Sequence, residues 1–157
     1  AARHFDAGSP VLINNVDILS NVNLRKFYNI AAESEAAATP VDAVLLVSWR
    51  KTKRYLLFDD DMRLVGWTNI ETGEVKSPYP ELDPRKCRMY AFAGIHVISP
   101  RVFPLMDAFP EKFSIIDFYL KTCATHNIKG YVKDDLKLMD IGKLDTLAQA
   151  ETFISEL

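Results

Sequence analysis

The 157-residue sequence has little cysteine, no long apolar run and almost no net charge. Its two cysteines, Cys87 and Cys123, lie in neither a CxxC nor a zinc-binding spacing, which favours two free thiols in a reducing cytoplasm. The apolar runs are too short to cross a bilayer, and the first residues contain no apolar segment of a secretory signal. A net charge of −2 gives no electrostatic reason to expect binding to nucleic acid or to an anionic membrane. We therefore expect a cytoplasmic protein that binds neither.

The composition is that of an ordinary globular protein. Hydrophobic residues make up 48% of the chain and charged residues 25%, and the length suffices for one domain with a packed core. Apolar runs at 11–13 and 43–48 are typical of strands buried on both faces, and residues 21–38 between them repeat apolar side chains with a helical period. This order predicts a right-handed crossover with parallel pairing. We expect one α/β domain with a mostly parallel sheet.

The middle of the chain predicts antiparallel elements. Residues 55–59 and 64–69 are short strand patterns around an acidic turn, which is typical of a β-hairpin. A longer strand pattern covers 88–99 and contains Gly94. A glycine inside a strand indicates a bulge or a close approach of the backbone to a ligand. We interpret His96, on the same strand, as a packed or solvent-facing residue.

Charged and polar residues near these strands allow more than one interpretation. Residues 50–54 contain four positive charges, which we interpret as a solvated turn, with phosphate contact as the alternative. Residues 59–61 are three consecutive aspartates, but they lack the ligand spacing and distal glutamate of a calcium loop, so we expect a turn. Ser114 precedes a helical pattern and is predicted to cap that helix.

Two aspartates stand where a predicted strand ends. Asp17 follows the apolar run 11–13, and Asp140 follows a short strand pattern at 136–139. Ligands of open α/β sheets gather outside the carboxyl ends of the strands, so two strands of one sheet would bring these carboxylates to one cation. A few carboxylates plus substrate phosphates usually hold Mg²⁺. The alternative is that each aspartate only caps a helix or closes a turn.

Four short stretches, taken in order, share their pattern with one known family. They are Asn-Val-Asp-Ile at 15–18, Leu-Val-Gly-Trp at 64–67, Phe-Ala-Gly-Ile-His-Val at 92–97 and Asp-Ile-Gly at 140–142. The first resembles that family's Asn-Gly-Asp-Ile, the third its Phe-x-Gly-Ile-x-Val strand and the last its Asp-x-Gly-Thr motif. The chain thus resembles the sugar-1-phosphate nucleotidyltransferases, above all the mannose-1-phosphate guanylyltransferase-like and N-acetylmuramate-1-phosphate uridylyltransferase-like branches.

The resemblance implies a three-layer Rossmann-like fold and a reaction. A nucleotidyl group would pass from an NTP to a sugar 1-phosphate, giving a nucleotide sugar and pyrophosphate. Asp17 and Asp140 would hold Mg²⁺ and be the catalytic residues, while Asn15, Asn69 and Gly94 would bind substrate. The same resemblance implies a role in nucleotide-sugar biosynthesis for cell-envelope polysaccharide, and it leaves a homo-oligomer open.

The sequence also departs from the family pattern. Val16 stands where the family usually has glycine, residues 68–70 stand where many relatives have a Glu-Lys pair that touches the sugar, and Ser114 stands where some relatives have a sugar-binding glutamate. The metal positions match while the sugar positions differ, so the sequence identifies neither the sugar nor the base.

One family feature does not occur in residues 1–157. This feature is the glycine-rich phosphate loop, Gly-x-Gly-Thr-Arg with Pro-Lys downstream, and the only glycine near the N-terminus is Gly8. We therefore expect a partial nucleotidyltransferase domain, corresponding to the C-terminal two-thirds, that is inactive alone. Two alternatives are a non-catalytic sugar-phosphate-binding or regulatory subunit and a metal-dependent glycosyltransferase, whose Asp-x-Asp spacing occurs only in 59–61.

Overall fold

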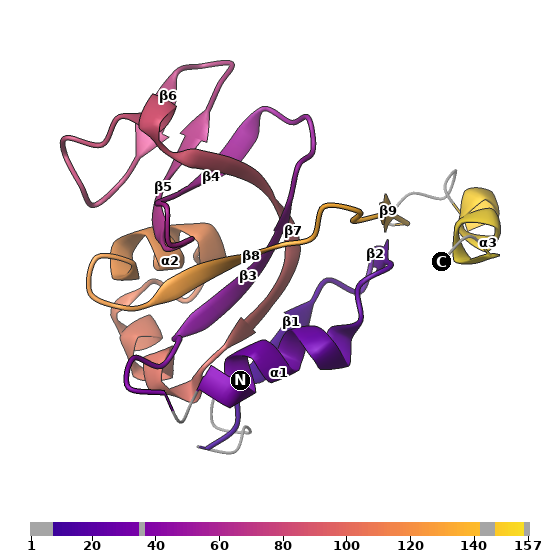
Figure 1. The fold of residues 1–157 in the computed structure, drawn as a ribbon, viewed down its shortest axis with the longest axis horizontal. Coiled ribbons are helices and arrows are strands. Elements are labelled where there is room, and N and C mark those ends of the chain that lie inside the picture. Colours follow the sequence, from indigo (N-terminus) through magenta and orange to yellow (C-terminus); the bar gives the residue numbers. More distant parts are fainter. Residues whose placement is uncertain (1–7, 35–36, 142–146, 156–157) are drawn as a thin grey trace.

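The computed structural model describes residues 8–34, 37–141 and 147–155 (Figure 1). Its main sheet has seven strands in the hydrogen-bonded order β6-β5-β4-β7-β3-β8, with β1 also paired to β7. The strands of this sheet are β1 (Val11–Asn14), β3 (Ala43–Ser48), β4 (Arg54–Phe58), β5 (Leu64–Asn69), β6 (Glu74–Lys76), β7 (Arg88–Ile98) and β8 (Ile128–Val132). The remaining elements are β2 (Ile18–Ser20), β9 (Leu138–Asp140), α1 (Leu24–Ser34), α2 (Ile115–Thr122), α3 (Leu147–Ser155) and the 3-10 helices η2 (Pro84–Lys86) and η3 (Pro100–Ala108).

Helix α1 confirms the predicted helix within 21–38 over a shorter range. It begins after Asn23, whose side-chain oxygen accepts a hydrogen bond from the backbone N–H of Lys26 at 2.9 Å and so caps the first turn. Phe27 and Ala31, one turn apart, are its buried residues. None of the helices in the described ranges is long and apolar enough to span a membrane.

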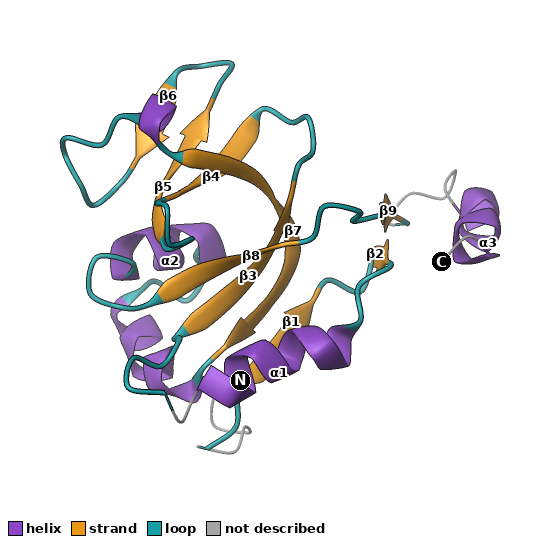
Figure 2. Cartoon of the chain, in the orientation of Figure 1, coloured by secondary structure: helices purple, strands orange, loops and turns teal. Residues whose placement is uncertain are grey.

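Helices cover both faces of the main sheet (Figure 2). On one face, Phe27 of α1 belongs to the same buried cluster as Leu46 of β3 and Ile95 of β7. On the other face, Phe118 and Tyr119 of α2 join a cluster that contains side chains of β3 and β4. β3 is buried along its whole length between these layers, as predicted. The expected three-layer α/β architecture is therefore confirmed.

The strand pairing, however, is mostly antiparallel, which corrects the expected mostly parallel sheet. β7 lies between β1 and β3 and is antiparallel to both, because Ile98 has Val11 and Ala43 as its two partners. β1 and β3 run in the same direction without pairing, since the crossover through α1 skips one strand position. β3 and β8 form the one parallel pair among the strands described. β1, paired only with β7 in the described sheet, is partly exposed rather than buried on both faces.

The predicted hairpin and the predicted long strand are both confirmed. β4 and β5 pair antiparallel, and the carboxylate of Asp59 closes their turn by accepting the backbone N–H groups of Asp61 and Arg63 at 3.0 and 2.8 Å. The backbone N–H of Gly130 donates to the carbonyl of Met62 at 2.9 Å. The hairpin turn therefore reaches β8, and this end of the sheet curls over the α2 face.

β2 and β9 form a separate two-stranded antiparallel sheet, seen beside the main sheet in Figure 1. Asn21, which follows β2, joins this ribbon to the segment before β9. Its side chain donates to the carbonyl of Asp135 at 2.8 Å and accepts the backbone N–H of Lys137 at 2.9 Å. The strand predicted at 136–139 is therefore present as β9, but it does not join the main sheet.

Candidate functional site

The backbones of the two predicted metal ligands, Asp17 and Asp140, lie close together at one end of the β2–β9 ribbon. Asp17 lies in a turn in which the backbone N–H of Ile18 donates to the carbonyl of Asn15 at 3.1 Å. Ile18 is paired with Asp140, and the backbone N–H of Ile141 donates to the carbonyl of Asp17 at 2.8 Å. The ribbon thus brings together two aspartates that are far apart in sequence. The expectation that they end two strands of one parallel sheet was wrong, because the start of β2 meets the end of β9 in an antiparallel pair.

Gly94 of β7 joins this group through Asn15. The pairing of β3 with β7 is irregular between Leu45 and Val47, and Gly94 lies opposite this irregularity with a φ of +77°. The bulge that the glycine indicated is therefore present. A Cβ at this position would lie 3.2 Å from the side-chain nitrogen of Asn15. The absence of a side chain at Gly94 leaves room for the Asn15 side chain, which lies against it.

The donor atoms of this group fit Mg²⁺. Asp17 and Asp140 are exposed, and carboxylate oxygens are hard ligands of the kind that Mg²⁺ selects. In the described part of the chain, no group of three or more His, Cys, Asp or Glu side chains is placed to hold a metal. A pair of carboxylates does not enclose an ion, so coordination positions stay open for water or for phosphate oxygens.

Asn69 and Ser114, the two positions at which the sugar contacts depart from the family, line one cavity. Its volume is about 350 Å³, and it lies between β5 and α2. Ser114 occupies the N-cap position of α2 as predicted, but its hydroxyl makes no capping hydrogen bond, which leaves it available to a ligand. An ion pair between Lys76 and Asp117, 3.8 Å long, joins the two sides of the cavity.

Sequence reasoning missed two arginines at this cavity. Arg54 lines it together with Asn69, and Arg50 and Arg54 both line an adjoining cavity of about 250 Å³ that also contains Phe92. Arg50 donates weakly to the carbonyl of Phe92 at 3.4 Å, and Arg54 forms no ion pair with any carboxylate in the described ranges. Lys53, from the same basic segment, is instead paired with Glu71 at 2.8 Å. The signal in the sequence is the basic run 50–54 after a buried strand, for which phosphate contact is the alternative to a solvated turn.

The cavity lined by Arg50 and Arg54 and the contact between Gly94 and Asn15 both involve β7. Phe92 lines the cavity and Gly94 contacts Asn15, and these two β7 positions are two residues apart. Two residues of a strand span about 7 Å, which is roughly the size of one sugar phosphate.

His96 is part of the core and not of this site. Its Nδ1 is hydrogen-bonded to the Tyr119 hydroxyl at 2.5 Å, and only 4% of the residue is exposed. Burial lowers the pKa of His96 from its ordinary 6.5 to about 4 and raises the pKa of the Tyr119 hydroxyl. Both side chains are therefore uncharged at neutral pH, which confirms the interpretation of His96 as a packed residue.

These elements define a mixed α/β fold with an acidic ribbon beside a cationic cavity, and solved structures share this fold. One is described as a glucose-1-phosphate thymidylyltransferase from Bacillus anthracis in complex with sucrose, with 12% identity over 96% of this chain and a TM-score of 0.66. Another is the inositol-1-phosphate CTP transferase from T. maritima, with 16% identity over 98% of the chain and a TM-score of 0.60.

Both neighbours are sugar-phosphate nucleotidyltransferases by name, and at these identities the likeness shows a common fold. The fold expected from the sequence resemblance is therefore confirmed. The chain spans 56% and 58% of the lengths of these two proteins. No family model and no curated protein matches the sequence.

Proposed function

We propose that this chain forms the acceptor-binding and metal-binding part of a sugar-1-phosphate nucleotidyltransferase. The complete reaction transfers a nucleotidyl group from an NTP to a sugar 1-phosphate and releases pyrophosphate. The observation that carries the proposal is the turn 15–18, in which Asn15 contacts the bulged backbone of Gly94 and Asp17 lies at the end of β9 that contains Asp140. A cavity lined by Arg50 and Arg54 includes Phe92, on the same strand as Gly94. The nucleotidyltransferase fold of the two structural neighbours supports it.

In this proposal the cavity between β5 and α2 holds the acceptor. Arg54 and Arg50 would pair with the sugar phosphate, because guanidinium groups bind phosphate oxygens with two hydrogen bonds. Asn69 and Ser114 would bond sugar hydroxyls. The backbone at Gly94 would lie against the sugar ring, where a side chain would prevent the approach. Which sugar binds depends on the hydroxyls that Asn69 and Ser114 can satisfy.

The chemical step needs orientation and charge neutralisation. A phosphate oxygen of the bound acceptor would attack the α-phosphorus of the NTP in line, and the bond to the pyrophosphate oxygen would break. Asp17 and Asp140 would hold Mg²⁺, which when bound neutralises charge on the phosphates. The arginines would keep the attacking oxygen in place. No proton has to be removed from the acceptor, because a phosphate oxygen is already a nucleophile.

Turnover in this proposal also needs a phosphate loop for the nucleotide. Residues 1–157 contain no Gly-x-Gly-Thr-Arg sequence. Incubation of the purified chain with NTP and sugar 1-phosphate is therefore expected to release no pyrophosphate, while the chain should still bind the acceptor. Robust pyrophosphate release by residues 1–157 would contradict this division of roles.

The direct test is calorimetric titration of the chain with glucose 1-phosphate and other hexose 1-phosphates. Arg54→Gln should lower the affinity for the most tightly bound hexose 1-phosphate by about ten-fold, since a charge-assisted hydrogen bond contributes about 1.5–3 kcal/mol. Arg25→Gln is the matched control, because Arg25 is exposed on α1, far along the chain from the cavity residues. Binding of free glucose as tightly as glucose 1-phosphate would refute the phosphate role of Arg54.

A second candidate is a sugar-phosphate-binding subunit that performs no catalysis. A full-length protein that lacks the glycine-rich phosphate loop would favour it. The two functions differ in their need for metal. Catalysis predicts that Mg²⁺ binds at Asp17 and Asp140, whereas a simple binding subunit predicts acceptor affinity that does not change when Mg²⁺ is removed with EDTA.

A further inference from the structure

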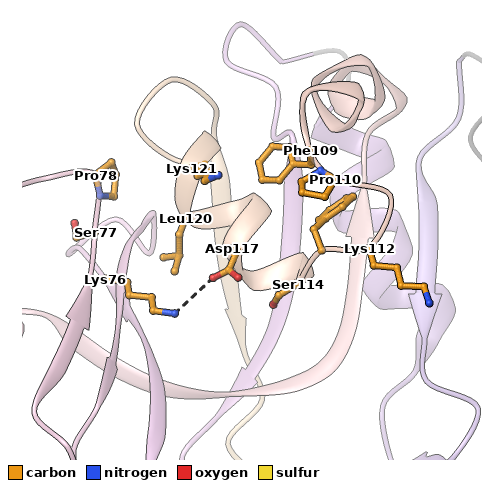
Figure 3. A pocket seen from close by; sticks show the side chains of 11 residues that line it. Lys76, Ser77, Pro78, Phe109, Pro110, Lys112, Ser114, Asp117, Leu120 and Lys121 are labelled. Atoms are coloured by element: carbon orange, nitrogen blue, oxygen red, sulfur yellow. Dashed lines mark ion pairs between the residues drawn. The ribbon is translucent and has the colours of Figure 1, made fainter.

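A second, larger cavity adjoins the proposed acceptor site. Its volume is about 700 Å³, and it is an open cavity lined by α2, the loop 109–114 and residues 76–78 (Figure 3). The Lys76–Asp117 ion pair belongs to the lining of both cavities and so forms a wall between them. The volume is within the range of small-molecule sites, about 300–1,000 Å³.

One side of this larger cavity is aromatic. The rings of Phe109 and Phe113 have centroids 5.0 Å apart, and Phe109 packs edge to face on Phe118 at 5.3 Å. Phe118 is almost completely buried, and its contact with Phe109 holds the Phe109 ring in place. Phe113 keeps 36% of its surface exposed. The cavity therefore offers a fixed aromatic surface to which a flat apolar group can stack.

The rest of the lining is cationic. It contains Lys76, Lys112 and Lys121 but only Asp117 as a carboxylate. The Lys121 amine lies 4.8 Å above the centroid of the Phe109 ring and pairs with no carboxylate in the described ranges. Lys76 is 3.8 Å from both Asp117 and Glu74, so its charge is shared between two long contacts. Figure 3 shows the Lys112 amine directed away from the other lining residues.

We propose that this cavity binds a small amphipathic anion, in addition to the acceptor proposed above. The ligand has a flat apolar or aromatic body that stacks on Phe109 and Phe113. It carries a carboxylate, phosphate or sulfonate that pairs with the Lys121 amine, which lies over the Phe109 ring. The proximity of the Lys121 amine to the Phe109 ring lets one compact molecule make both contacts. The cavity volume favours such a molecule over a peptide segment.

A fluorescence titration of the full chain with 8-anilinonaphthalene-1-sulfonate tests this, since the probe is an aromatic anion. The neutral N-phenyl-1-naphthylamine has the same ring body without the sulfonate. We expect one binding site for the anionic probe and at least about five-fold weaker binding of the neutral one. Lys121→Gln should weaken the anionic probe by about three-fold, the size of a partly exposed charge interaction. Phe113→Ala should weaken the binding of both probes.

Lys112→Gln is the matched control, because it removes the same charge from the same lining at an amine that points away. It should change the affinity by less than Lys121→Gln. Matched near-ultraviolet circular dichroism and melting temperatures exclude loosened variants, which bind this probe without specificity. Equal affinities for the two probes, or equal effects of the two lysine substitutions, would overturn the proposal. Tighter binding of a short acidic tryptophan-containing peptide, or a dimer that the probe dissociates, would overturn it by showing another occupant.

Discussion

Replacing Gly94 with alanine is expected to lower both stability and acceptor binding. The φ of +77° lies in the left-handed region, where a Cβ raises the free energy by about 1–2 kcal/mol. Alanine also restricts the unfolded chain, which offsets about 0.4–1 kcal/mol of that strain. We expect a net loss of about 1 kcal/mol, which lowers the melting temperature of a chain of this size by about 2–4 °C. The new Cβ would also lie 3.2 Å from the Asn15 side-chain nitrogen and displace that amide.

Gly73→Ala separates the strain from the site. Gly73 has a φ of +73°, and a Cβ there would meet no atom within 4 Å. Both variants should therefore lose similar stability in urea unfolding. Only Gly94→Ala should weaken calorimetric binding of glucose 1-phosphate, by about ten-fold, which corresponds to about 1.4 kcal/mol of lost contact.

Three results would refute this reasoning, each at a different step. If neither variant loses stability, the strain assigned to positive φ is wrong at both positions. If both lose stability and both keep wild-type affinity for glucose 1-phosphate, the backbone of Gly94 does not contact the acceptor. Equal loss of affinity in both variants would mean that the binding effect follows from reduced stability alone.

Three further predictions can be tested separately. Asp17→Asn and Asp140→Asn should each lower the Mg²⁺ affinity measured by calorimetry by about ten-fold or more and leave the melting temperature nearly unchanged. The two effects should not add in the double variant. Wild-type affinity in either single variant would remove that residue from the site. Asn69→Ala should change the order of affinities among hexose 1-phosphates, and a uniform effect on all of them would argue against a sugar contact. Because the pKa of His96 falls from 6.5 to about 4 on folding, the unfolded chain takes up its proton first. The contribution of His96 to the free energy of unfolding should thus be complete above pH 6.5. It should fall by about 3 kcal/mol as the pH is lowered to 4. Urea unfolding should show that His96→Gln flattens this decline and that His126→Gln, at a partly exposed histidine, does not.

Local patterns predicted most of the secondary structure. The alternation around the acidic turn predicted β4 and β5, the long run at 88–99 predicted β7, and the helical period predicted α1. These elements follow from side-chain spacing, which is a property of consecutive residues. The position of the bulge was also predictable, because only Gly94 interrupts the β7 pattern.

The candidate site was predicted less completely. Asn15, Asp17, Gly94 and Asp140 were expected from the sequence, and the structure places all four at adjoining positions, although their roles stay a proposal. The position of Arg54 at the cavity was missed, because nothing in a basic run tells which of its side chains line a cavity and which, like Lys53, pair with a neighbouring carboxylate.

The sequence by itself determined which segments are helices and strands, since the period of apolar side chains selects between them. It also determined that oxygen ligands and an open glycine backbone are available. Only the tertiary structure decided that β7 separates β1 from β3 and that β9 pairs with β2 outside the main sheet. The physical reason is that the backbone hydrogen bonds of a strand can be satisfied by any partner strand in register. The choice among partner strands depends on the apolar surface that distant segments bury, such as α1 and α2 on the two faces of the sheet. The local periodicity of a strand does not show which distant segment will cover it.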